Sequence, residues 1–147
     1  MIRLFFSTPS ETEFFDAAKV LSEVVMERRE LVFPDVRDED LPRTARVRVK
    51  HAYRILGHAT FLIESALFLT SDGDARGGAD WIRSDQMDEE EFCRRFQGIK
   101  GVVAQVLAYT PDGEQVQLFQ RDMPGSVTDS PRGSRGIGFD RVWIPAL

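Results

Sequence analysis

Residues 59–69 read ATFLIESALFL, the longest nearly unbroken apolar stretch around a charged residue in the chain's centre. It is apolar apart from Thr60, Glu64 and Ser65, and a short run rich in β-favouring residues predicts a strand buried on both faces. Because an isolated charge is costly to bury, Glu64 must be hydrogen-bonded, paired or bound to a metal. Two interpretations stay open. Either the chain turns at Glu64 and Ser65 and exposes a polar corner, or Glu64 lies at the mouth of a cleft and faces a ligand.

The composition is that of an ordinary globular protein. The chain has 147 residues, of which 42% are hydrophobic and 29% charged, and this predicts one domain with a substantial core rather than a membrane protein. The formal net charge of -5 gives no general attraction to nucleic acid or anionic lipid, so we expect neither as a partner. The short apolar start is no signal peptide, which favours a cytoplasmic location. The single cysteine, Cys93, is expected to be half-buried in an amphipathic helix.

The hydrophobic pattern predicts alternating strands and helices. We expect strands over residues 2–6 and 31–36, helices over 11–29, 43–57 and 88–97, and an exposed, mobile loop over 71–80. Two further strands, 102–110 and 114–122, flank a Pro-Asp-Gly turn that is typical of a hairpin. The helix over 43–57 carries five basic residues. These residues either bind phosphate or form a solvated face that pairs with the acidic loop before them.

A glycine-rich segment near the end of the chain is a candidate anion-binding loop. Residues 125–145 contain Pro131, Arg132 and Arg135, so backbone N–H groups and two guanidinium groups can approach an anion there. The pattern matches neither a Walker loop nor the dinucleotide fingerprint. A plain surface loop before a final strand is therefore the alternative.

Together these segments resemble the inosine triphosphate pyrophosphatase family, which hydrolyses deaminated purine nucleoside triphosphates to monophosphate and pyrophosphate. The anchors are FSTPSETEFFDAAKVL (6–21), DEDLP (38–42), KHAYRILGHATFLIESALF (50–68), the hairpin turn and PRGSRGIGFDRVWIP (131–145). The resemblance implies an elongated α/β fold, with a mixed, twisted sheet flanked by helices and a central cleft between two lobes. It also implies a single domain over residues 1–147 that lacks the family's C-terminal helix, and a homodimer that we place around Trp81 and Ile82.

The resemblance also implies which residues form the site. The expected nucleotide-binding residues are Thr8, Ser10, Arg132, Arg135, Phe139 and Asp140. Glu64 is the surviving acidic position, expected to act in catalysis and to hold magnesium, while Ser65 replaces the family's catalytic aspartate. Glu13 stands where the family has a phosphate-binding lysine, and Arg43 where it has a metal-binding glutamate.

These departures remove metal ligands and phosphate-binding cations together, and magnesium-dependent hydrolysis needs both. The sequence therefore predicts a protein that binds a nucleotide or nucleoside derivative in its cleft, with hydrolysis lost or strongly impaired. An ion pair of Arg43 with Glu64 or with Glu13 is expected to fill the former metal site.

Two alternative functions stay open. One is a divergent but active magnesium-dependent pyrophosphatase that acts on inosine or xanthosine triphosphate. In that case Glu64 is the sole metal ligand and a nearby aspartate such as Asp38, Asp40 or Asp72 assists it. The other is a non-enzymatic, dimeric interaction module.

Overall fold

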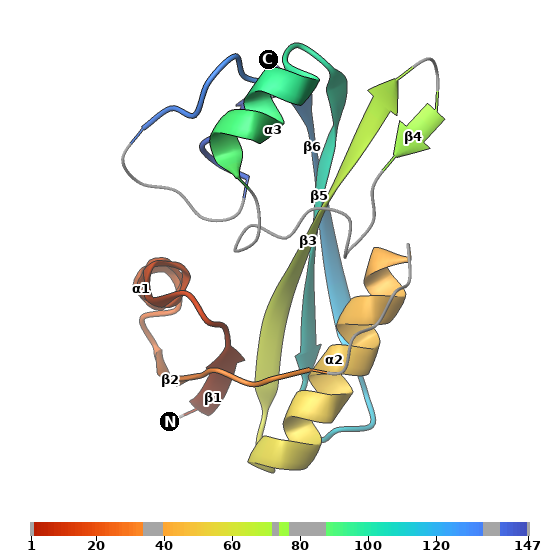
Figure 1. The fold of residues 1–147 in the computed structure, drawn as a ribbon. Helices are drawn as coiled ribbons and strands as arrows, with labels where there is room; N and C mark the ends of the chain where they lie inside the picture. Colours follow the sequence, from red (N-terminus) through yellow and green to blue (C-terminus); the bar gives the residue numbers. More distant parts are fainter. Residues whose placement is uncertain (1, 34–39, 72–73, 77–87, 134–138, 147) are drawn as a thin grey trace. The chain divides into compact units, whose positions relative to one another are not determined.

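The computed structural model describes residues 2–33, 40–71, 74–76, 88–133 and 139–146. In chain order the elements are β1 (Ile2–Ser7), α1 (Glu11–Val20), β2 (Val24–Arg29), α2 (Leu41–Leu56), β3 (Thr60–Ser71), β4 (Asp74–Arg76), α3 (Glu89–Phe96), β5 (Lys100–Thr110), β6 (Gln117–Val127) and β7 (Trp143–Pro145) (Figure 1). The predicted α/β class is confirmed. No described helix is both long enough and apolar enough to cross a membrane.

The described strands form one mixed sheet. Their order is β2-β1-β3-β5-β6-β7, and β4 pairs with β3 outside this path. β1 runs parallel to β2 on one side and to β3 on the other, whereas β7 is antiparallel to β6. This arrangement confirms the predicted mixed sheet flanked by helices.

The chain divides into two compact units. The first is built within residues 1–36, 42–64 and 106–120, and the second within 37–41, 65–105 and 121–147. The strands β3, β5 and β6 contribute to both units. The elongated two-lobed shape, the central cleft and the single domain without a C-terminal helix stay predictions.

In the first unit, strand alternation sends neighbouring side chains to opposite faces of the sheet. On one face Phe6 of β1 stacks on Phe61 of β3, with ring centroids 4.2 Å apart. Phe14 and Ala17 of α1 pack against this cluster, so α1 covers this face. α2 covers the other face (Figure 1). Along β3, Glu64 follows a residue of the first cluster, so strand alternation points its side chain to the opposite face, where Arg48 of α2 reaches it.

The helix predicted over residues 11–29 is wrong in its second half. α1 ends at Val20, where the N–H of Leu21 donates to the carbonyl oxygen of Ala17 over 2.9 Å. Val24 then opens β2, which pairs along its whole length with β1. The β-branched Val24 and Val25 suit this pairing better than a helix. The strand predicted over 31–36 is not seen at residues 31–33, and residues 34–36 lie outside the described chain.

The predicted helices over 43–57 and 88–97 are confirmed as α2 and α3. Gly57 follows α2 with a φ of +68°, the left-handed conformation that glycine adopts readily. Asp88 caps α3, because its side chain accepts a hydrogen bond from the N–H of Glu91 over 3.2 Å. Cys93 of α3 is fully buried, not half-buried, and its Sγ lies 3.3 Å from Oγ1 of Thr128.

The predicted hairpin is confirmed as β5 and β6. Oδ1 of Asp112 accepts hydrogen bonds from the N–H groups of Glu114 and Gln115, each over 2.9 Å, which holds the turn. The loop predicted over 71–80 is wrong at residues 74–76, because β4 pairs there with the end of β3. Trp81 and Ile82, on which the homodimer prediction depends, lie outside the described residues.

Candidate functional site

The order of the parallel strands indicates where a ligand binds in the first unit. β1 connects to β2 through α1 on one face, and β2 connects to β3 through α2 on the other, so the strand order reverses at β1. Open α/β sheets bind ligands beyond the carboxyl ends of their strands at such a point. The candidate site therefore comprises the turn 7–10 after β1, Arg28 of β2, Arg48 of α2 and Glu64 of β3.

Glu64 forms a partly buried ion pair in this site. Nη1 of Arg48 donates hydrogen bonds to both carboxylate oxygens of Glu64, over 3.0 and 3.1 Å, and the Arg48 and Glu64 side chains are 16% and 15% exposed. The Arg48 guanidinium also lies 5.7 Å from the centroid of the Phe33 ring. This pairing meets the requirement that a buried carboxylate has a partner.

The alternative of an exposed polar corner at Glu64 is wrong. β3 runs as one 12-residue strand through Glu64 and Ser65, without a turn. Arg48 pairs with the carboxylate within this strand, and Leu62, Ala66 and Leu67 are buried on either side of Glu64. The predicted Arg43 ion pairs with Glu64 and with Glu13 stay predictions; the Arg43 side chain is exposed.

The turn after β1 carries two of the predicted nucleotide-binding residues, and the structure brings them together. The N–H of Ser10 donates to Oγ1 of Thr8 over 3.1 Å, and Oγ of Ser10 accepts from the N–H of Glu13 over 3.1 Å. Ser10 is therefore the N-cap of α1. Glu11 and Glu13 lie in the first turn of this helix, where acidic residues complement its dipole.

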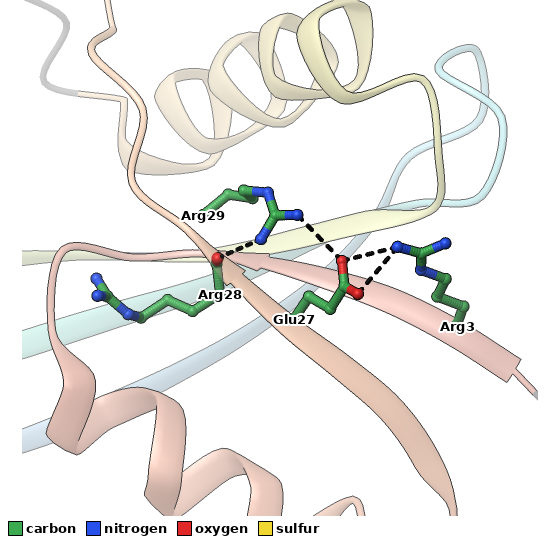
Figure 2. Close-up of polar contacts among 4 residues, drawn as sticks. All are labelled: Arg3, Glu27, Arg28 and Arg29. Carbon is green, nitrogen blue, oxygen red and sulfur yellow. Dashed lines mark hydrogen bonds and ion pairs between the residues drawn. The ribbon is translucent and has the colours of Figure 1, made fainter.

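Sequence reasoning missed Arg28, which also lies at this turn. Its Nη1 donates to the carbonyl oxygen of Thr8 over 3.3 Å, and its Nη2 lies 3.5 Å from Oε1 of Glu11. The neighbouring Arg29 points elsewhere and, with Arg3, converges on Glu27 (Figure 2). Strand alternation sends the two arginines to opposite faces, and a helical prediction for residues 24–29 does not contain this alternation.

Glu27 pairs with two arginines on the neighbouring surface. It accepts hydrogen bonds of 2.9 Å from Arg3 to each of its oxygens and one of 3.2 Å from Arg29 (Figure 2). The hydrogen bond from Arg3 is the main cause that holds the pKa of Glu27 below its usual value, with the charges of Arg3, Arg29 and His58 adding to it. Both arginines are therefore engaged by an internal anion.

The remaining predicted nucleotide-binding residues belong to the second unit. Arg132 is exposed and donates to Asp129 over 3.1 Å, and this hydrogen bond holds the pKa of Asp129 below its usual value. Phe139 is buried in the core with Val142 and Trp143, so most of its ring is covered by protein. Asp140 is exposed. Arg135 lies outside the described residues. That these residues bind a nucleotide stays a prediction.

A polar cavity of about 690 Å³ also lies in the second unit, beside the start of α3 and residues 129–131. Two carboxylates in its wall already have partners. Glu89 pairs with Arg141 over 2.8 Å, and Asp129 pairs with Arg132. The cavity wall thus satisfies much of its own charge.

The described residues contain no cluster dedicated to a metal ion. Magnesium prefers several oxygen ligands in octahedral geometry, commonly carboxylates, phosphates and water. No group of three or more His, Cys, Asp or Glu side chains gathers in the described part of the chain. Glu64, the predicted metal ligand, is engaged by Arg48.

Comparisons with known proteins identify the family. The model of the Ham1 family matches residues 18–147. The chain is 22% identical over 149 residues to the dITP/XTP pyrophosphatase of Methanopyrus kandleri, covering 98% of this chain and 79% of the relative. It is 27% identical over 149 residues to the dITP/XTP pyrophosphatase of Thermococcus kodakarensis, covering 98% and 80%.

The fold has solved counterparts. The structure of a HAM1 protein from Coxiella burnetii matches with a TM-score of 0.75 at 13% identity, covering 97% of this chain and 81% of that one. A dITP/XTP pyrophosphatase from Mycobacterium abscessus matches with a TM-score of 0.71 at 13% identity, covering 98% and 84%. The resemblance to the inosine triphosphate pyrophosphatase family is thereby confirmed, and the chain belongs to the Ham1 family.

Proposed function

We propose that this chain binds a nucleotide or nucleoside derivative and that magnesium-dependent hydrolysis is lost or strongly impaired in it. The observation that carries the proposal is the Arg48–Glu64 ion pair, with its hydrogen bonds of 3.0 and 3.1 Å. The carboxylate that the sequence assigns to metal binding already has a cationic partner inside the protein.

Replacing this partner with magnesium is unfavourable for two reasons. Glu64 would exchange charge-assisted hydrogen bonds for the metal, and Arg48 would lose its counter-ion while staying only 16% exposed. A partly buried cation without a counter-ion is costly, and a nearby divalent cation adds repulsion. Ser65 adds no carboxylate to the site. Without the metal, the charge that develops during pyrophosphate release lacks its main stabilisation.

The nucleotide class rests on the relatives. Those compared above are dITP/XTP pyrophosphatases, so we propose a purine nucleotide of this kind as the ligand. Thr8 and Ser10 of the first unit, and Arg132, Arg135, Phe139 and Asp140 of the second, are the proposed contacts. A homodimer is part of the proposal, by the same resemblance.

Thermal unfolding with a nucleotide panel tests this proposal, because a ligand that binds only the folded state raises Tm. We would compare dITP, XTP and their monophosphates, each with magnesium and with a chelator. The variants are Glu64→Gln and a matched control, Glu23→Gln, at an exposed carboxylate. We expect a nucleotide to raise Tm equally with magnesium and with chelator.

Two results would count against the proposal. Stabilisation that requires magnesium and is lost in Glu64→Gln but kept in Glu23→Gln would favour the active pyrophosphatase. A panel in which no nucleotide raises Tm would favour the interaction module.

A further inference from the structure

We infer that one buried water molecule bridges Ser7 of β1 and Arg48 of α2 inside the first unit, and that Ser7 thereby positions the Arg48 guanidinium against Glu64. This hydration site belongs to the ion pair on which the proposed function rests, but its occupation needs neither a nucleotide nor a metal ion. It gives a role to Ser7, which none of the predicted contacts involves.

Two buried side-chain atoms lack a hydrogen-bond partner in the part of the chain that the structure describes. They are Oγ of Ser7 and Nε of Arg48. Ser7 is only 6% exposed, and the Arg48 side chain 16%. Buried polar atoms in proteins almost always have a partner, which is either another protein group or an ordered water molecule. One small group that contacts both atoms would satisfy both.

Strand register puts the two atoms on the same face of the sheet. Phe5 of β1 is in register with Thr60 of the parallel strand β3. Residues in register on parallel strands point to the same face, and every second residue along a strand shares that face. Ser7 therefore points to the same face as Glu64. Arg48 reaches Glu64 on this face from α2, which covers it (Figure 1).

The same register limits the distance between Ser7 and the ion pair. Continued along β1 and β3, it sets Ser7 beside Leu62, two residues before Glu64. From ordinary strand spacing and rise, the Cα atoms of Ser7 and Glu64 are about 8 Å apart. Polar groups separated by more than about 3.5 Å are commonly bridged by a water molecule. A buried water needs about two to four polar partners, and the two unsatisfied atoms meet the lower limit.

A neutral water molecule suits these atoms better than an ion does. Nε of Arg48 can only donate, whereas the Ser7 hydroxyl can donate or accept. A water molecule accepts from Nε and forms its second hydrogen bond with the hydroxyl. Glu64 already balances the charge of Arg48 through hydrogen bonds of 3.0 and 3.1 Å, so the site has little attraction for an anion.

The water anchors the guanidinium at a second edge. Nη1 of Arg48 donates to Glu64, and Nε donates to the water, so the group cannot rotate away from the carboxylate without losing both contacts. Ser7 is therefore a positioning residue that acts on Glu64 through Arg48. Its hydroxyl helps to keep the carboxylate paired.

Crystal structures of the wild-type chain and of Ser7 variants test the site directly. In the wild type we expect a water within about 3.2 Å of both Oγ of Ser7 and Nε of Arg48. Ser7→Ala should lose this water or leave it weakly ordered, and the Arg48 guanidinium should become less ordered with it. Ser7→Thr keeps a hydroxyl and should restore both. Ser126→Ala, at a strand serine of the second unit, is the matched control and should change neither.

Thermal unfolding gives a second test, in which the sign of the change decides. Ser7→Ala should lower Tm by about 3–5 °C, because it removes a hydroxyl that is hydrogen-bonded to the water. Removing a hydroxyl that truly has no partner would raise Tm instead. Arg48→Lys combined with Ser7→Ala should lower Tm by less than the sum of the two single losses, since both changes break the same bridge. Arg48→Lys combined with Ser126→Ala should be additive.

The hydration site and the proposed function can fail separately. No water between the two atoms in the wild-type crystal, or a higher Tm in Ser7→Ala, would overturn the hydration site. Either result together with nucleotide binding that needs no magnesium would leave the proposed function standing. A bridging water that depends on Ser7, in a chain that releases pyrophosphate with magnesium, would support the hydration site and refute the proposed function.

Discussion

Arg48 of α2 donates hydrogen bonds to both carboxylate oxygens of Glu64, in the middle of β3. This relationship explains why an acidic residue can stand in an otherwise apolar strand. The guanidinium satisfies the carboxylate directly, so the strand needs neither a turn nor a bound metal at this point.

Arg48→Ala should destabilise the protein by about 1–3 kcal/mol, because it leaves a partly buried carboxylate without its partner. The free energy of unfolding in urea measures this loss. Arg46→Ala, at an exposed arginine on the same helix, is the matched control and should change stability by less than about 0.5 kcal/mol. Equal effects of the two substitutions would show that the ion pair contributes nothing specific.

Adding Glu64→Gln to Arg48→Ala should recover part of the lost stability. The second change removes the stranded charge, and residues that share an interaction do not behave additively. A double-mutant cycle from the same urea curves gives the coupling energy. Strictly additive losses would mean that Arg48 and Glu64 do not interact in solution.

The Glu27 network should make stability depend on pH. Hydrogen bonds from Arg3 hold the pKa of Glu27 below its usual value, so this group stabilises the folded state above the unfolded glutamate pKa of about 4.3. That contribution is lost as the pH falls through the lowered folded pKa. Glu27→Gln should therefore lower Tm at neutral pH and have a smaller effect in strong acid. A Tm difference that stays constant across this range would contradict the assignment.

Gly113→Ala should destabilise more than Gly57→Ala. Both glycines have positive φ values, +84° and +68°, which cost other residues about 1–2 kcal/mol. A Cβ at Gly113 would also lie 2.5 Å from Cδ1 of Tyr53, whereas nothing lies within 4 Å at Gly57. Tyr53 must move or the turn must shift, and chemical unfolding of both variants measures the difference. A larger loss for Gly57→Ala would show that the hairpin turn tolerates the added methyl group.

The sequence predicted elements best where one local signal dominated. The Pro-Asp-Gly turn predicted the hairpin, and Gly57 predicted the end of α2, because both depend on backbone conformations set within a few residues. Val24 and Val25 continued the helical spacing of α1 by coincidence. Their actual role depends on pairing with β1, about twenty residues earlier, and spacing within one segment carries no information about such a partner.

The site was predictable only in part for the same reason. The need of Glu64 for a partner followed from its apolar neighbours, but the choice of Arg48 depends on how α2 lies over β3. Phe139 matched a motif, yet the core of the second unit covers its ring. Helical spacing gives Arg28 no special position, and only the pairing of β2 with β1 shows that it faces the turn at Thr8.

The central claim is that Glu64 pairs with Arg48 and not with a metal ion. Release of pyrophosphate from dITP and XTP in the presence of magnesium tests it most directly. We would compare the wild-type chain with Glu64→Gln at the same protein concentration. We predict that both release pyrophosphate at the rate of the buffer alone. Wild-type turnover on the order of 1 per second or faster that disappears in Glu64→Gln would contradict the claim, because Glu64 would then be serving a working metal site.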